Sequence, residues 1–218
     1  MSSYIEIAKR IAGIINSPEL EVGIMMGVLS VPKDLAYMAY GFIDTESRSL
    51  RQSEKIRMAN AIRYGILESE NFRKSIEIIF CIFKRYLTDK EQDSATGDIT
   101  GTFIGRMLTN LVLSSRLTNA IAVKNNALYR GGAVVLGNIL LVGGMADRSI
   151  YTSQRLQRFN PEVWNALHLK DFDLLYFLIE PAVQPFVEAL YVRRTQGPEA
   201  FEKIISLAEE LINGKKSC

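Results

Sequence analysis

Apolar residues recur every three or four positions along most of the chain, which is the spacing of amphipathic helices. A first helix is predicted near the N-terminus, with an inward face of Ile5, Ala8, Ile11, Ala12 and Ile15. A longer helix is predicted over residues 46–67, with Leu50, Ile56, Ala59, Ile62 and Ile66 inward and Arg48, Arg51, Lys55 and Arg63 in solvent. Another helix is predicted to begin at Ser69 and to end around Leu87. The pattern therefore predicts an all-α fold, a multi-helix bundle.

Proline and glycine mark the ends of helices in the C-terminal third. Asn160-Pro161-Glu162 combines an N-cap residue, a proline at the first helical position and an acid in the first turn. The last helix is predicted between Gly197-Pro198 and Asn213-Gly214. Between these two helices, Asp171 is expected to cap an apolar run, and Pro181 and Pro185 are expected to break or restart the helix that follows.

The polar stretch 88–98 carries almost no apolar residue and is predicted to be an exposed loop within one domain. We expect a single helical domain in which N-terminal helices occupy residues 1–87 and C-terminal helices occupy residues 147–218. The intervening residues 99–146 are predicted to form a central apolar, glycine-rich helical hairpin.

The predicted hairpin differs in composition from the rest of the chain. Two apolar stretches, 101–123 and 127–146, are joined by a polar turn, and no Asp or Glu occurs from Gly101 to Ala146. Small residues at intervals of four allow another backbone to approach closely, as in membrane helices that associate. The candidate membrane-insertion or packing residues are Gly97, Gly101, Gly105, Gly131, Gly132, Ala133, Gly137, Gly143 and Gly144. The candidate contacts for an anionic membrane surface are Arg106, Arg116, Lys124 and Arg130.

The length and charge of the hairpin argue against a permanent two-helix membrane protein. Residues 131–146 would reach about 24 Å at about 1.5 Å per residue, less than the hydrocarbon core of about 30 Å. Arg116 would lie well inside the first stretch. A hairpin buried in a soluble bundle and a hairpin that leaves the bundle on contact with a membrane both fit the pattern. A buried strand within residues 131–146 is a further alternative, because that stretch is rich in β-branched residues.

Enzyme motifs are absent from the sequence. There is no phosphate loop, dinucleotide fingerprint, nucleophile elbow or Cys-x-x-Cys pair. The single histidine, His168, excludes multi-histidine metal sites and is expected to be an ordinary capping or surface residue. Asp171 and Asp173 would point to different sides of a helix, so we expect them to be poor partners. We predict a non-enzymatic protein that needs no metal or cofactor.

The remaining polar and sulfur chemistry is also ordinary. Glu180 and Glu188 are expected to pair with Arg193 or Arg194. Cys81 lies in an apolar run and is expected to be buried, so that with the terminal Cys218 it makes no disulfide framework. The net charge of +2 gives no general attraction to nucleic acid. No basic segment followed by an apolar one occurs at the N-terminus, so we expect no secretory signal and a cytoplasmic soluble form.

A bundle of amphipathic helices around an apolar hairpin resembles the pore-forming domain of colicins and related interbacterial toxins. The resemblance lies in architecture and composition and involves no diagnostic motif. It implies a bacterial membrane-acting effector whose hairpin inserts into a lipid bilayer. This hairpin carries four basic residues and is followed by about 70 residues, whereas the colicin-type hairpin is nearly uncharged and close to the C-terminus. The alternative is a soluble protein-binding module, an adaptor or an immunity-type protein with a cognate protein partner, in which the hairpin stays in the core. An enzyme with an unfamiliar site is the third option.

Overall fold

The computed structural model describes residues 3–16, 48–66, 69–93 and 145–214. Nearly all of the described residues are helical and none of them lies in a strand, which confirms the all-α prediction. The elements are α1 (Tyr4–Asn16), α4 (Arg48–Arg63), α5 (Ser69–Asp93), α9 (Met145–Phe159), α10 (Pro161–His168), the 3-10 helix η1 (Phe172–Leu175), α11 (Tyr176–Gln196) and α12 (Pro198–Gly214).

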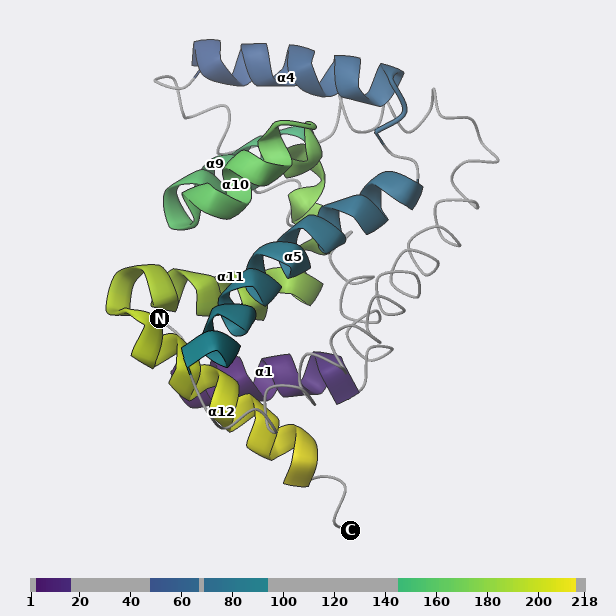
Figure 1. Cartoon of the computed structure of the whole chain (residues 1–218). Coiled ribbons are helices and arrows are strands. Elements are labelled where there is room, and N and C mark those ends of the chain that lie inside the picture. The colour runs from purple at the N-terminus through teal and green to yellow at the C-terminus, as the bar shows by residue number, and fades with distance from the viewer. Residues whose placement is uncertain (1–2, 17–47, 67–68, 94–144, 215–218) are drawn as a thin grey trace.

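Helix α11 forms the centre of the described core. It packs against α1, α5, α9 and α12, so that α4, α9 and α10 lie on one side of it and α1 and α12 on the other (Figure 1). Its apolar residues, such as Phe177, Val183 and Leu190, are buried. Phe186 stands edge-on to Phe80 and Phe83 of α5, with ring centroids 4.9 and 5.2 Å apart. Such edge-to-face contacts add to the free energy of burying the rings.

Several predicted helix ends are confirmed. Asn160 accepts a hydrogen bond from the backbone N–H of Val163 and so caps α10, whose first residue is Pro161. Gly197 has φ +94° and separates α11 from α12, and α5 begins at Ser69 as predicted. However, α5 continues to Asp93, so its last turns run into the stretch predicted as a loop. Glycine suits the turn after α11, because a side chain is strained at that backbone angle.

The two prolines of α11 do not break it, contrary to the prediction from the sequence. Pro181 and Pro185 both lie inside a continuous helix from Tyr176 to Gln196. Each proline removes one helical hydrogen bond. Burial of the flanking apolar residues against four neighbouring helices compensates for this loss, because packing contributes more to the stability of a helix in a protein than local propensity does.

The inward faces of α1 and α4 also differ from the prediction. In α1, Ile7 and Ile14 are buried with Ala8, Ile11 and Ala12, whereas Ile5 is exposed. In α4, Met58, Ala61 and the adjacent Ile66 are buried, whereas Ile56 is 58% exposed. Lys55, predicted to lie in solvent, forms an ion pair with Asp147 of α9. The face of α4 is set by charged partners on other helices, which apolar spacing does not reveal.

Three further residues, Cys81, Glu180 and Glu188, differ from the prediction. Cys81 is exposed on the outer face of α5, although it lies in an apolar run. Glu180 pairs with Arg155 of α9, and Glu188 pairs with Arg10 of α1. Both acids lie on the face of α11 toward α9 and α1, while the predicted partners stack their guanidinium groups on tyrosine rings instead. These stacked pairs are Arg193 over Tyr86 and Arg194 over Tyr191.

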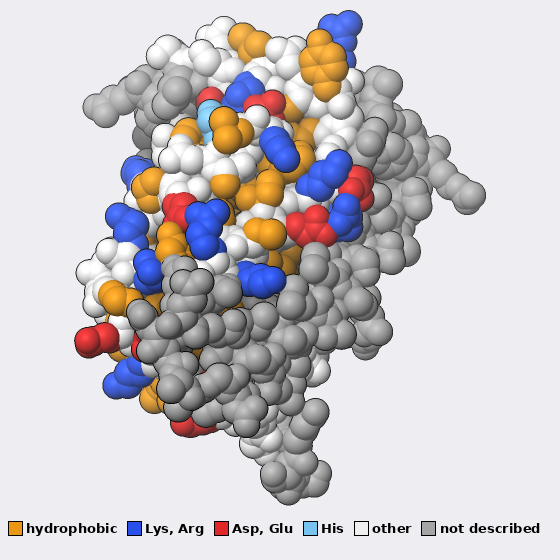
Figure 2. All heavy atoms as spheres, in the orientation of Figure 1, with side chains coloured by type: hydrophobic (Ala, Val, Ile, Leu, Met, Phe, Trp, Pro, Cys, Tyr) orange, Lys and Arg blue, Asp and Glu red, His pale blue; other side chains and the backbone are white. Residues whose placement is uncertain are grey.

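On the face shown in Figure 2, acidic and basic side chains lie among one another. None of the helices in the described ranges is both long enough and apolar enough to cross a bilayer.

Candidate functional site

The candidate residues of the predicted hairpin, and Gly97 just before it, lie outside the described residues. What the structure describes is the pair of helices on either side of them. Helix α5 ends at Asp93, and α9 begins at Met145, one residue before the predicted end of the hairpin. Ala146 is already buried in the body of the protein. The candidate site is therefore built from the polar contacts that hold the start of α9.

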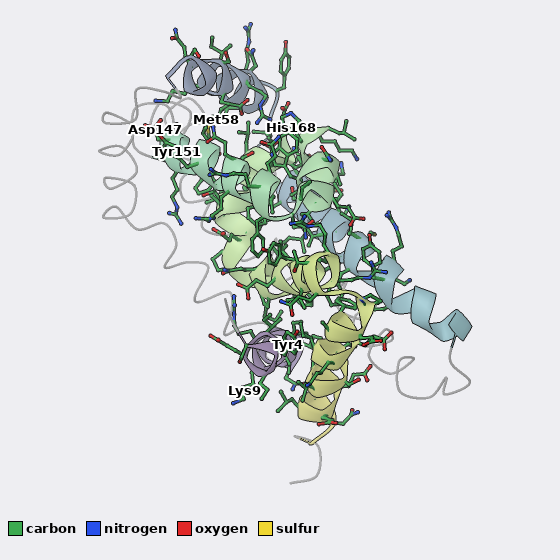
Figure 3. All side chains as sticks on the ribbon, turned by 90° about the vertical axis from the view of Figure 1, so that its left-hand side faces the viewer. Tyr4, Lys9, Met58, Asp147, Tyr151 and His168 are labelled. Atoms are coloured by element: carbon green, nitrogen blue, oxygen red, sulfur yellow. The ribbon has the colours of Figure 1, made fainter. Side chains whose placement is uncertain are left out.

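The first turns of α9 are held by buried polar side chains. Asp147 pairs with Lys55 of α4 at 2.8 Å, and Figure 3 shows Asp147 at the same end of the molecule as Met58 of α4. Ser149 donates a hydrogen bond of 2.7 Å to the carbonyl oxygen of Leu174 in η1. Both contacts reach elements distant in sequence, so they fix the position of α9 as well as its helical form.

One turn further along α9, Ser153 lies in a group of four side chains with Arg57 of α4, Asp171 and Asp173 of η1. We call this group the Asp173 cluster. Arg57 Nη2 donates to Asp173 Oδ2 at 2.7 Å, and Nη1 donates to Asp173 Oδ1 at 2.9 Å and to Asp171 Oδ1 at 2.8 Å. The hydroxyl of Ser153 donates to Asp173 Oδ2. The Asp173 side chain has no solvent exposure. A fully buried carboxylate is thus satisfied by three charge-assisted or neutral hydrogen bonds.

The backbone brings Asp171 and Asp173 to the same arginine. Asp171 has φ 59°, a left-handed conformation that aspartate tolerates better than most residues, and η1 follows it directly. Asp171 makes no side-chain cap to η1, and α11 begins only at Tyr176. The expectation that Asp171 and Asp173 are poor partners is therefore wrong, because they do not share one α-helix.

Electrostatics keeps the cluster ionised. Burial by itself would raise the pKa of Asp173, but the hydrogen bonds and the charge of Arg57 hold that pKa below its usual range. Burial also opposes the charged form of Arg57, yet its hydrogen bonds with Asp173 and Glu54 raise its pKa above the ordinary value. The two groups therefore form a stable ion pair rather than a group poised to exchange a proton near neutral pH.

His168 and Trp164 flank the cluster but do not turn it into a nucleophilic site. Trp164 donates its indole hydrogen to Ser153 Oγ at 3.0 Å, and its ring stacks on His168 with centroids 4.1 Å apart. His168 Nδ1 lies 3.4 Å from Asp173 Oδ1. Ser153 donates its hydroxyl hydrogen to the aspartate instead of to the histidine, and only 3% of Ser153 is exposed. An activated serine needs a neighbouring base and access to substrate, so the geometry favours a structural role for these residues.

The sequence does not reveal this cluster. Arg57 and Asp173 are 116 residues apart, and each alone has the local pattern of a solvated charge. In the described ranges, His, Cys, Asp and Glu nowhere gather in a group of three that could hold a metal ion. The cluster is suited to binding α4 to η1 and to the middle of α9.

No protein-family model matches the chain, and no curated protein or solved structure is significantly similar to it.

Proposed function

We propose that the chain is a non-enzymatic bacterial effector that acts on membranes, in which residues 101–144 insert into a target bilayer and the described helices form the anchoring body. The observation that carries the proposal is the acid-free, glycine-spaced composition of this stretch. Apolar surface combined with positive charge alone suits an anionic bilayer.

The helix that follows the stretch supports this division of roles. Residues 146–150 at the start of α9 are buried, and they are held by an ion pair to α4 and a hydrogen bond to η1. An inserting segment needs a firm attachment, because otherwise its movement would unfold the body. The polar contacts of Asp147 and Ser149 supply such an attachment immediately after the proposed segment.

The helix that precedes the stretch, α5, also supports this division of roles. Helix α5 buries Phe72, Ile76, Ile79 and Phe83 and packs against α10, α11 and η1. The body thus has a hydrophobic core that connects both flanking helices. If α5 or α9 left this core, the newly exposed apolar surface would cost about 25 cal/mol per Å². We therefore expect these two flanking helices to stay in the body.

Release of an encapsulated dye from vesicles tests the proposal. The full chain is added to vesicles of phosphatidylglycerol and phosphatidylcholine at neutral and acidic pH, with and without a potassium diffusion potential. We expect release from the anionic vesicles and little from pure phosphatidylcholine. The variant Leu140→Asp should release much less dye, because a charge at the bilayer centre costs about 2.5–3.5 kcal/mol.

The matched control is Leu169→Asp, which makes the same exchange at the end of α10, where Leu169 is 86% exposed. It should release dye like the wild type, and circular dichroism should show both variants folded. No release by the wild type under any of the conditions would refute the proposal. Equal and strong hydrogen-exchange protection of residues 131–144 with and without vesicles would favour the protein-binding alternative.

A further inference from the structure

We propose that the cavity between α1, α9 and α11 is a binding site for a small, uncharged ring compound that carries a hydrogen-bonding group. The cavity has a volume of about 240 Å³ and lies on the side of α11 that faces Arg155 and Ile7. This site is separate from the Asp173 cluster and does not depend on the membrane proposal.

The walls of the cavity are largely apolar. Ile7 of α1, Leu156 of α9, and Val187 and Val192 of α11 line it. At one end the rings of Phe159 and Tyr191 stack nearly parallel, with centroids 4.0 Å apart. A dry apolar cavity of about 150 Å³ can hold benzene, so this volume suits one ring or a fused pair of rings.

A strip of polar side chains runs along the α11 side of the cavity. Tyr176, Glu180, Gln184 and Glu188 are spaced by four residues, so they lie on one face of the helix. The Tyr176 hydroxyl is buried, and burial followed by the negative charge of Glu180 raises its pKa well above the usual value. Convergence of a few polar groups in an otherwise apolar cavity is typical of small-molecule sites.

The charges around the cavity are compensated in pairs. Arg155 donates to Glu180, and Arg10 donates to both carboxylate oxygens of Glu188 at 3.0 and 3.1 Å. A ligand with a net charge would have to compete with one of these pairs or bring an uncompensated charge into a partly buried site, which is costly. An uncharged ligand avoids both costs.

Gln184 supplies the polar recognition. It lies between the two ion-paired acids on the same face of α11, and its amide offers both a donor and an acceptor. A ring N–H or O–H directed at this amide would satisfy it while the ring contacts the apolar walls. This combination defines the ligand class.

Titration calorimetry with indole as the probe tests the site. We expect saturable binding of indole and at least about tenfold weaker binding of indole-3-acetate and tryptamine, a difference of about 1.4 kcal/mol. The variant Gln184→Phe fills the cavity and should weaken indole binding at least about tenfold as well. The control Gln157→Phe places the same ring on the exposed surface of α9 and should bind indole like the wild type.

A second measurement covers the case in which Gln184→Phe does not fold. In the wild-type protein, indole should give nuclear Overhauser contacts to the methyl groups of Ile7, Leu156 and Val187. Contacts to other methyl groups instead, equal binding of indole by the two phenylalanine variants, or equal binding of the charged analogues would overturn the proposal. Absence of saturation up to the solubility of indole would overturn it too.

Discussion

The guanidinium fork of Arg57 closes on the carboxylate of Asp173, with Nη2 2.7 Å from Oδ2 and Nη1 2.9 Å from Oδ1. Asp173 has no solvent exposure, whereas the Arg57 side chain is 20% exposed. A bidentate pair of this kind is both stronger and more directional than a single hydrogen bond. Through it, α4 is bound to η1 at one defined position.

Replacing Arg57 by alanine should destabilise the fold strongly. The change leaves the charge of Asp173 buried without its main partner, and breaking a buried pair in this way costs about 3–5 kcal/mol. Urea unfolding at pH 7 followed by circular dichroism measures the effect. The control Arg73→Ala removes an arginine whose ion pairs with Glu70 and Glu77 are solvent-accessible, and it should leave the unfolding midpoint nearly unchanged. Equal midpoints for the two variants would contradict the assigned role of Arg57.

The stability of the protein should fall at acidic pH partly because of Asp173. Its pKa is depressed in the folded state, since the hydrogen bonds and charge of Arg57 outweigh the effect of burial. The folded state therefore binds this proton less readily than the unfolded state. The contribution of Asp173 is complete above the unfolded pKa and is lost as the pH falls from about 5 through the folded pKa.

Urea unfolding of Asp173→Asn from pH 7 to pH 3 tests this dependence. The variant is expected to be less stable at pH 7 and to lose less stability on acidification than the wild type. Glu199→Gln, a change at an exposed acid in the first turn of α12, should retain the wild-type acid dependence. A wild-type dependence in Asp173→Asn would show that other carboxylates account for the acid sensitivity.

The centre of the core should be sensitive to truncation at Phe186. Its ring is 1% exposed and packs edge-on against Phe80 and Phe83, so Phe186→Ala leaves a cavity between α5 and α11. Such substitutions cost about 3–5 kcal/mol. Ile56→Ala, at a site that is 58% exposed, should change the free energy of unfolding by less than about 0.5 kcal/mol. Chemical denaturation of both variants measures the difference. A large loss of unfolding free energy in Ile56→Ala would mean that Ile56 faces inward, as the sequence predicted.

The sequence predicts those helix ends that are determined by residues close to them in the chain. The cap at Asn160, the first-turn Pro161 and the break at Gly197 could be recognised because each acts through the backbone within a few residues. The all-α class followed from apolar spacing over many residues. The break predicted at the prolines of α11 is absent, because the cost of a proline is local whereas the compensating burial comes from four other helices.

The candidate site could not be predicted for a related reason. A buried arginine and a solvated arginine have the same appearance in a sequence, and only the distant Asp173 distinguishes Arg57 from its neighbours. Likewise, the acids that flank Gln184 could be predicted to form ion pairs, but their partners Arg155 and Arg10 come from helices whose positions depend on the whole fold.

Replacing Gly13 or Gly197 by alanine should change the stability of the protein in opposite directions. Gly13 lies within α1 and Gly197 has φ +94° after α11, and a Cβ atom at either position would meet no atom within 4 Å. Steric contact therefore plays no part, and backbone conformation alone decides the outcome. Gly13→Ala should stabilise the protein by up to about 1 kcal/mol, the difference in helix propensity. Gly197→Ala should destabilise it by about 1–2 kcal/mol, because an alanine is strained in the left-handed region.

Thermal unfolding of the two variants against the wild type checks both signs in one experiment. The midpoint should rise for Gly13→Ala and fall for Gly197→Ala. A fall for both would mean that Gly13 is needed for close packing of α1, contrary to the open space beside it. A rise for both would mean that the chain after α11 leaves the positive φ angle at little cost, in which case the separation of α11 from α12 depends on Pro198.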